Sequence, residues 1–137
     1  SKQFTIGQFS IMQYDLEGRT RQFSKDVLGL LAEIKATDLN RNIINQLARS
    51  VTSTGANYCE ANAACSRKDF KNKIFICRKE IQETKYWLEM LAAVNPEQKE
   101  KLRELWREAQ QLTLIFSKIS SSLRKKEEPS KINEIEN

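Results

Sequence analysis

The chain of 137 residues carries a net charge of +5, and its 39% hydrophobic and 30% charged residues are typical of one globular domain. The absence of histidine removes the commonest general base and the usual imidazole metal ligand, so we expect no enzymatic activity, catalytic residue, metal or cofactor. No apolar run approaches the roughly 18 residues that a membrane span needs, and no signal-peptide pattern is visible. We therefore expect a cytoplasmic protein without a membrane partner.

Residues 1–14 are polar and aromatic, and we expect them to form a flexible N-terminal arm. From residue 15 to about residue 35, apolar side chains recur at the spacing of an amphipathic helix. They are Phe23, Val27, Leu30, Leu31 and Ile34. The helical bundle is predicted to cover residues 15–125, and the charged residues 126–137 to form a disordered tail.

The sequence ATDLN predicts a break, with Asp38 or Asn40 as the N-cap of a second helix. This helix carries an unbroken seam whose members alternate at three and four positions. The seam consists of Ile44, Leu47, Val51, Thr54, Tyr58, Ala61 and Cys65. Because helical rotation places Cys59 and Cys65 on different faces, they cannot form a metal site. Cys65 and Cys77 fall on seam positions and are expected in the core.

Ser66 followed by Asp69 is a relaxed capping box, which predicts a third helix from Arg67 to about Ala92. Its seam consists of Phe70, Ile74, Cys77, Ile81, Thr84, Leu88 and Leu91.

A fourth helix is predicted to begin after Asn95, with Pro96 at the first helical position and Gln98 at the third. Its seam consists of Leu102, Leu105, Ala109, Leu112, Phe116, Ile119 and Leu123.

Four amphipathic helices joined by short connections predict an all-α protein, an antiparallel up-down-up-down four-helix bundle. A longer coiled coil is the alternative that the same seams allow. The caps and Pro96 favour chain reversals, so the bundle is the prediction.

Three blocks of the sequence are rich in unusual residues. They are YDLEGRT at residues 14–20, GANYCEANAACSRKDFKNKI at residues 55–74 and CRKEIQETKYWLEML at residues 77–91. Together they resemble the bacterial four helix bundle protein family, whose founding members are encoded within intervening sequences of large-subunit (23S) ribosomal RNA genes. The resemblance covers residues 14–92, and the fourth helix matches in pattern only.

The resemblance implies an antiparallel four-helix bundle and, as in several relatives, a homopentameric ring with a basic surface. A more distant relative is the accessory variability protein of diversity-generating retroelements, a pentamer that binds a reverse transcriptase and nucleic acid. Neither group is known for enzymatic activity. The chain departs from the common pattern in its QFTIGQFSI extension and at Cys59, where an aliphatic residue is more usual.

Small side chains dominate the end of the second helix, from Gly55 to Ala64. A glycine inside a helix costs about 1 kcal/mol relative to alanine, so a packing reason is expected. Small residues let another helix approach closely, either inside the bundle or from a neighbouring subunit. The residues predicted to be structural or to lie at a subunit interface are Gly55, Asn57, Tyr58, Glu60, Asn62, Tyr86 and Trp87.

Glu60 lies next to the seam, so we expect it to be partly covered and paired with a cation. A structural ion pair is favoured over an acid–base role because no second carboxylate accompanies it. The candidate partners, from the same or an adjacent subunit, are Arg49, Arg67 and Arg78.

Residues 67–85 hold seven basic and three acidic side chains, and this net charge of +4 is most of the excess charge of the chain. On the third helix, six of the basic side chains fall within an arc of about 120°. We call them the basic stripe: Arg67, Lys68, Lys71, Arg78, Lys79 and Lys85. Such a stripe can neutralise phosphates, and a solvated face with some ion pairs is the alternative.

These observations predict a non-enzymatic homo-oligomer that binds nucleic acid, with RNA favoured, through the basic stripe. The alternative is a protein-interaction adaptor, such as an accessory subunit of a reverse transcriptase. The sequence has no aromatic sheet motif or glycine clamp of the common RNA-binding domains, so the nucleic-acid target stays open.

Overall fold

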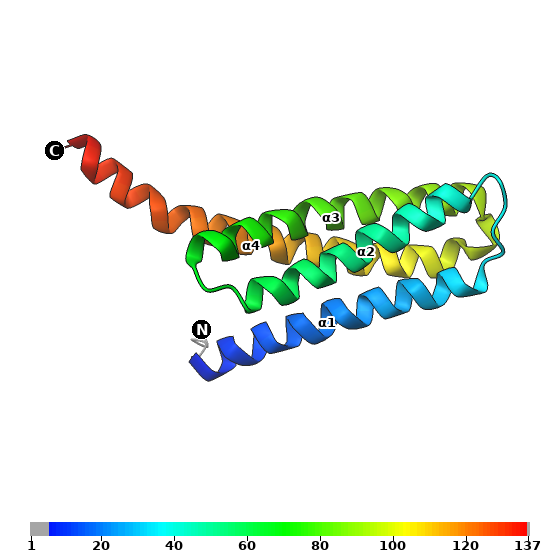
Figure 1. The fold of residues 1–137 in the computed structure, drawn as a ribbon, viewed down its shortest axis with the longest axis horizontal. Helices are drawn as coiled ribbons and strands as arrows, with labels where there is room; N and C mark the ends of the chain where they lie inside the picture. Colours follow the sequence, from blue (N-terminus) through cyan, green and yellow to red (C-terminus); the bar gives the residue numbers. More distant parts are fainter. Residues whose placement is uncertain (1–5, 137) are drawn as a thin grey trace.

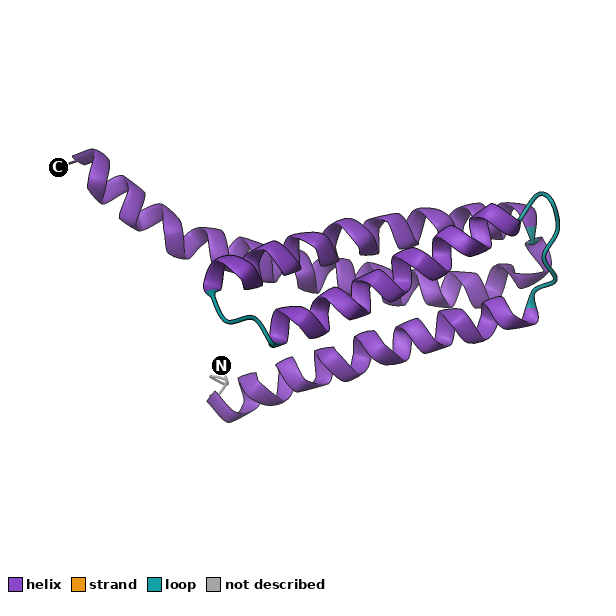
Figure 2. Ribbon diagram, viewed as in Figure 1, coloured by secondary structure: helices purple, strands orange, loops and turns teal. Residues whose placement is uncertain are grey.

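The computed structural model describes the backbone of residues 6–136 and the side chains of residues 15–125. The described part of the chain consists of four α-helices and one short 3₁₀ helix, without a strand (Figures 1 and 2). The elements are α1 (Ile6–Glu33), α2 (Arg41–Asn62), α3 (Arg67–Val94), η1 (Pro96–Gln98) and α4 (Lys99–Glu136). The prediction of an all-α four-helix bundle is confirmed.

The four helices lie side by side, and short connections reverse the chain after each of the first three (Figure 1). Helix α3 packs between α2 and α4, and α1 packs against α2 and α4. Side-chain partners on α3 and α4 pair in opposite order, since Lys85 meets Gln110 and Glu89 meets Trp106. This register decides which parts of the two helices share a surface.

The predicted seams form the core where the four helices meet. Tyr58 of α2 packs against Phe116 of α4, with ring centroids 5.8 Å apart. The fully buried side chains of α3 include Ile74, Cys77 and Ile81. Burial of this apolar surface is the main force that holds the helices together.

The predicted seam of the second helix is wrong at its last position. Helix α2 ends at Asn62, and Cys65 lies exposed in the loop that follows. The predicted cap is confirmed, because the backbone N–H of Asp69 donates to the Ser66 hydroxyl at 3.0 Å. Ser66 begins α3 from an extended backbone, so the chain must leave the helical conformation before it and Cys65 cannot continue the seam.

Asn40 is buried at the turn between α1 and α2, but its side chain does not cap α2 as predicted. Instead the N–H of Thr37 donates to Asn40 Oδ1 at 2.7 Å, and the N–H of Asn40 donates to Thr37 Oγ1 at 3.2 Å. Asn40 Nδ2 donates to the carbonyl of Lys35 and to Asn95 Oδ1. The amide therefore joins the α1–α2 turn to the α3–η1 turn.

The same contact explains why Asn95 does not act as a side-chain cap. Its amide oxygen accepts from Asn40, and its amide nitrogen donates to Glu97 at 2.7 Å. The chain does restart at Pro96 as predicted, but the first turn is a 3₁₀ helix that leads into α4.

We predict that Asn40→Ala lowers the free energy of unfolding by about 2 kcal/mol, because it leaves buried donors and acceptors without partners. The matched control is Asn42→Ala, which removes an exposed amide two residues later and should change stability by less than about 0.5 kcal/mol. Urea denaturation followed by circular dichroism measures both. Equal effects of the two substitutions would contradict the bridging role of Asn40.

Both ends of the bundle differ from the predicted boundaries. Helix α1 begins at Ile6, so residues 6–14 continue it instead of forming an arm, and residues 1–5 lie outside the described residues. Helix α4 continues through residues 126–136 and projects past the other helices (Figure 1). The predicted tail is rich in lysine and glutamate, which favour helix.

None of the helices in residues 6–136 combines the length and apolar character that crossing a bilayer requires.

Candidate nucleic-acid interface

The basic stripe lies along the flank of α3 that borders α4. Arg67, Lys68 and Lys79 are exposed, and Lys71 and Arg78 are half-buried. Among the described residues, Lys68, Arg78 and Lys79 make no ion pair. Their charge is therefore available to an anionic partner.

Lys85 belongs to the basic stripe by its position on α3, but its side chain contacts residues of α4 in the groove between α3 and α4. Its ammonium donates to Gln110 Oε1 at 2.6 Å and lies 5.2 Å from the centre of the Trp106 ring. The side chain is half-buried, so we do not count it among the free cations of the surface.

Two acids of α3, Glu80 and Glu83, lie on its opposite flank, where they are paired with α2. Arg49 of α2 forms ion pairs with Glu80, at 3.1 Å, and with Glu83. Lys73, the one α3 lysine placed outside the stripe in residues 67–85, pairs with Glu60 of α2 at 2.6 Å. The ion pairs between α2 and α3 thus neutralise Glu80 and Glu83, whereas Lys68, Arg78 and Lys79 make no ion pair with any described residue.

Helix α4 adds cations that the sequence analysis did not assign to the interface. Arg67 Nη2 donates to the carbonyl of Leu123 at 3.4 Å, which brings the start of α3 beside residues 123–125. Arg124 and Lys125 are exposed there, and Lys118 is exposed further along α4. The sequence does contain a signal for these cations, because residues 109–125 include no acidic residue. We call the basic stripe together with these three residues the α3–α4 face.

The small-residue stretch of α2 packs inside the bundle. A Cβ added at Gly55 would lie 3.1 Å from Ser24 Oγ of α1, and Ser24 Oγ donates to the carbonyl of Val51 at 3.1 Å. Gly55 and Tyr58 are buried by their own chain, which agrees with the alternative of close helix packing inside the bundle. Asn57 is half-buried and donates to the carbonyl of Ser53 on its own helix.

Glu60 differs from the prediction. It is exposed, and its partner is Lys73 instead of Arg49, Arg67 or Arg78. The predicted arginines are used elsewhere or lie on the other flank of α3, whereas Lys73 faces α2. An exposed pair of this kind contributes at most about 1 kcal/mol, so Glu60 is a surface residue and not a buried ion.

Asn62 ties the end of α2 to α1. Its amide donates to Glu17 at 3.0 Å, and Glu17 also accepts from Arg21. Hydrogen bonds from Asn62 and then Arg21 lower the pKa of the Glu17 carboxyl. Nearby, Arg19 binds Glu108 of α4 through two hydrogen bonds, at 2.8 and 2.6 Å. The YDLEGRT and GANYCEAN blocks therefore contain residues that join α1 to its two neighbours.

Tyr86 and Trp87 form an edge-to-face pair on α3, with ring centroids 4.9 Å apart. Tyr86 is exposed, and Trp87 packs against the core. Trp87 Nε1 is a buried donor that has no partner in the part of the chain that the structure describes. Trp87 lies outside the α3–α4 groove, because it follows Glu83 by four residues and so falls on the flank of α3 that faces α2.

The three cysteines do not form a reactive or metal-binding cluster. Burial raises the pKa of Cys59 above its usual value and that of Cys77 to about 12, so both are neutral thiols at pH 7. Within the described residues, no group of three or more cysteine, aspartate and glutamate side chains is arranged to hold a metal ion.

Alkaline pH should destabilise the fold through Cys77 and Tyr58. Burial raises the pKa of Cys77 from 9.0 to about 12 and that of Tyr58 from 10.0 to about 12. The folded chain then holds more protons than the unfolded chain above pH 9, so stability falls as pH rises. From pH 9 to about 10.5 we expect a loss on the order of 2 kcal/mol.

Urea titrations at both pH values measure this loss. Cys77→Val should remove part of the pH dependence, whereas Cys65→Val, at an exposed loop position, should leave it unchanged. A loss that is the same in both variants would contradict the assignment to Cys77.

Comparisons with known proteins agree with the fold. The family described as 23S rRNA-intervening sequence protein matches the chain over residues 13–118. A crystal structure of a protein of unknown function from the S23 ribosomal protein family of Bacteroides thetaiotaomicron is 30% identical, with a TM-score of 0.66. The similarity covers 76% of this chain and 96% of that one. A comparison with curated proteins finds no match.

Proposed function

The chain belongs to the 23S rRNA-intervening sequence protein family, and from this membership we propose that it is a non-enzymatic helical bundle that binds RNA through the α3–α4 face. The observation that carries the proposal is the charge of Lys68, Arg78 and Lys79 on one flank of α3, which no residue within 15–125 pairs. Phosphate oxygens are the natural partners of such a surface, and binding through them depends little on sequence.

The distribution of charge on α3 favours an RNA-binding surface over an ordinary solvated surface. In a solvated face the signs are mixed, but here the acids Glu80 and Glu83 are paired with Arg49 on the other flank. Arg124 and Lys125 continue the face across the groove beside Arg67. The cations therefore extend over two helices, where they can contact several phosphates of a nucleic-acid backbone.

We further propose that the protein acts as a homo-oligomer, a pentamer by its family resemblance, in the cytoplasm. Ring symmetry would repeat the α3–α4 face and multiply weak phosphate contacts. Light scattering at micromolar concentration tests this, and a monomer would contradict it.

The second candidate function is a protein-interaction adaptor, for example an accessory subunit of a reverse transcriptase. The exposed apolar side chains Phe75, Tyr86 and Leu114 favour it, because they lie among the cations of the same two helices. Such a mixed surface also suits an acidic protein or a nucleoprotein.

A salt titration tests the RNA proposal. Fluorescence anisotropy of a labelled structured RNA, measured with increasing KCl, should give an affinity that falls linearly with the logarithm of the salt concentration. The slope of this line is proportional to the number of phosphates that the protein neutralises. An RNA that does not bind at low salt, while an acidic protein partner does, would favour the adaptor.

A further inference from the structure

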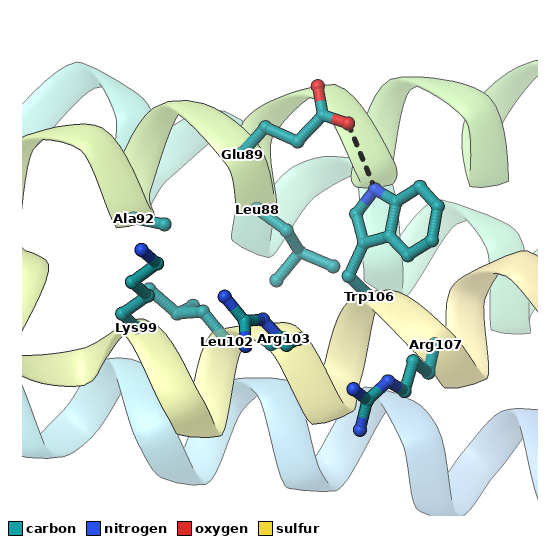
Figure 3. A pocket seen from close by; sticks show the side chains of 8 residues that line it. All are labelled: Leu88, Glu89, Ala92, Lys99, Leu102, Arg103, Trp106 and Arg107. Carbon is teal, nitrogen blue, oxygen red and sulfur yellow. Dashed lines mark hydrogen bonds between the residues drawn. The ribbon is translucent and has the colours of Figure 1, made fainter.

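A hollow of about 410 Å³ opens in the α3–α4 groove, near the α3–η1 turn (Figure 3). Its apolar wall is made by Leu88 and Ala92 of α3 and by Leu102 and Trp106 of α4. The volume lies within the range of small-molecule sites, about 300–1,000 Å³. We call it the Trp106 hollow.

The indole of Trp106 is held in place from two directions. Its Nε1 donates to Glu89 Oε1 at 3.1 Å, as drawn in Figure 3. Lys85, one helical turn before Glu89, lies over the ring at 5.2 Å from its centre. Ala92, three residues after Glu89 on α3, lines the hollow together with Trp106. The ring is thus a fixed flat surface beside the hollow.

The rim of the hollow is cationic. Lys99, Arg103 and Arg107 of α4 surround it, and Glu89 is the one acid among its lining residues. One oxygen of Glu89, Oε1, already accepts from the indole, and Arg103 lies 3.5 Å from Glu100 in an exposed pair. Within the described residues, Lys99 and Arg107 make no ion pair. The rim therefore offers Lys99 and Arg107 to an anion, and Arg103 can exchange its weak, exposed pair with Glu100 for a phosphate.

A ligand that fits must combine a flat apolar part with an adjacent negative charge. A nucleotide has this chemistry, since its base can stack on an indole and its phosphate can pair with arginine. In a duplex the bases are stacked on one another and do not reach a side pocket, whereas an unpaired base does. The hollow continues the groove beside the α3–α4 face, so an RNA bound to that face can reach it.

We propose that the Trp106 hollow binds one unpaired nucleotide of the RNA, with the base against Trp106 and a neighbouring phosphate at Arg103 and Arg107. This inference rests on the proposed RNA binding and adds a preference for RNA with unpaired bases. The α3–α4 face contacts phosphates in any RNA, and the hollow distinguishes unpaired from paired segments.

Tryptophan fluorescence tests the proposal directly. The chain has two tryptophans, so Trp87→Phe leaves Trp106 as the reporter. The probes are a single-stranded RNA of about 12 nucleotides, made of adenine and cytosine only, and the same strand paired with its complement. The single strand should quench Trp106 in a saturable way, and the duplex should not.

The rim is tested in the same background. Arg103→Gln with Arg107→Gln should weaken binding of the single strand by about fivefold or more and leave duplex binding much less affected. Both side chains are exposed, so these substitutions do not threaten the fold. The matched control, Lys25→Gln with Lys35→Gln, removes the same charge from exposed positions that do not line the hollow and should preserve the preference for the single strand.

The outcomes separate this inference from the proposed function. If the unsubstituted chain binds neither probe at low salt, the proposed function fails and this inference fails with it. If both probes bind but the duplex quenches Trp106 as strongly as the single strand, the hollow is not a site for unpaired nucleotides, while RNA binding stands. An acidic peptide that quenches as strongly as the single strand would assign the hollow to a protein partner and overturn the inference.

Discussion

Replacement of Lys68, Arg78 and Lys79 by glutamate should weaken RNA binding by about 100-fold or more at low salt, because it removes three phosphate contacts and adds three repulsive charges. The three side chains are chosen because they make no ion pair within the described residues, so no structural partner is lost. The salt dependence should also become shallower by about three phosphate contacts. Anisotropy titrations at several KCl concentrations measure both quantities.

The control for this triple variant keeps the same net charge. Reversal of Lys25, Lys35 and Arg41, which are exposed outside the α3–α4 face, changes the net charge from +5 to −1 as well, since 5 − 6 = −1. A surface that acts by local contacts should lose far more affinity in the first variant than in the control. If both variants lose the same affinity, only the overall charge matters and the α3–α4 face is not the binding site.

The second large effect concerns the core. Leu112 is fully buried at a seam position of α4, and Leu112→Ala should lower the free energy of unfolding by about 2–5 kcal/mol. The loss combines the transfer energy of the removed methyl groups with the cavity that they leave. Urea denaturation gives the value, and a melting curve shows whether unfolding stays cooperative.

Leu39 provides the matched control for Leu112. It is 68% exposed in the turn between α1 and α2, so Leu39→Ala makes the same chemical change without a cavity. We expect a change within about 0.5 kcal/mol. Equal losses in the two variants would mean that α4 does not pack its seam into the core as described.

The basic stripe shows what a helical wheel, the projection of residues around one helix axis, predicts and what it cannot predict. The wheel placed six cations on one flank of α3 and the acids Glu80 and Glu83 on another, and the ion pairs with Arg49 agree with that separation. It could not tell that Lys85 turns into the groove toward Gln110, because Gln110 is on another helix. For the same reason it assigned Glu60 to an arginine partner.

The sequence by itself determined the four helices, most of their seams and the Ser66 cap, because helical period and capping are local and act over three or four residues. Only the tertiary structure decided which flanks meet. Arg124 and Lys125 join the stripe because α4 returns beside α3, and Trp106 borders a hollow because Glu89 and Lys85 fix its ring. The period of a helix fixes the angle of a residue on its own axis, but the neighbour at that angle depends on how the helices pack.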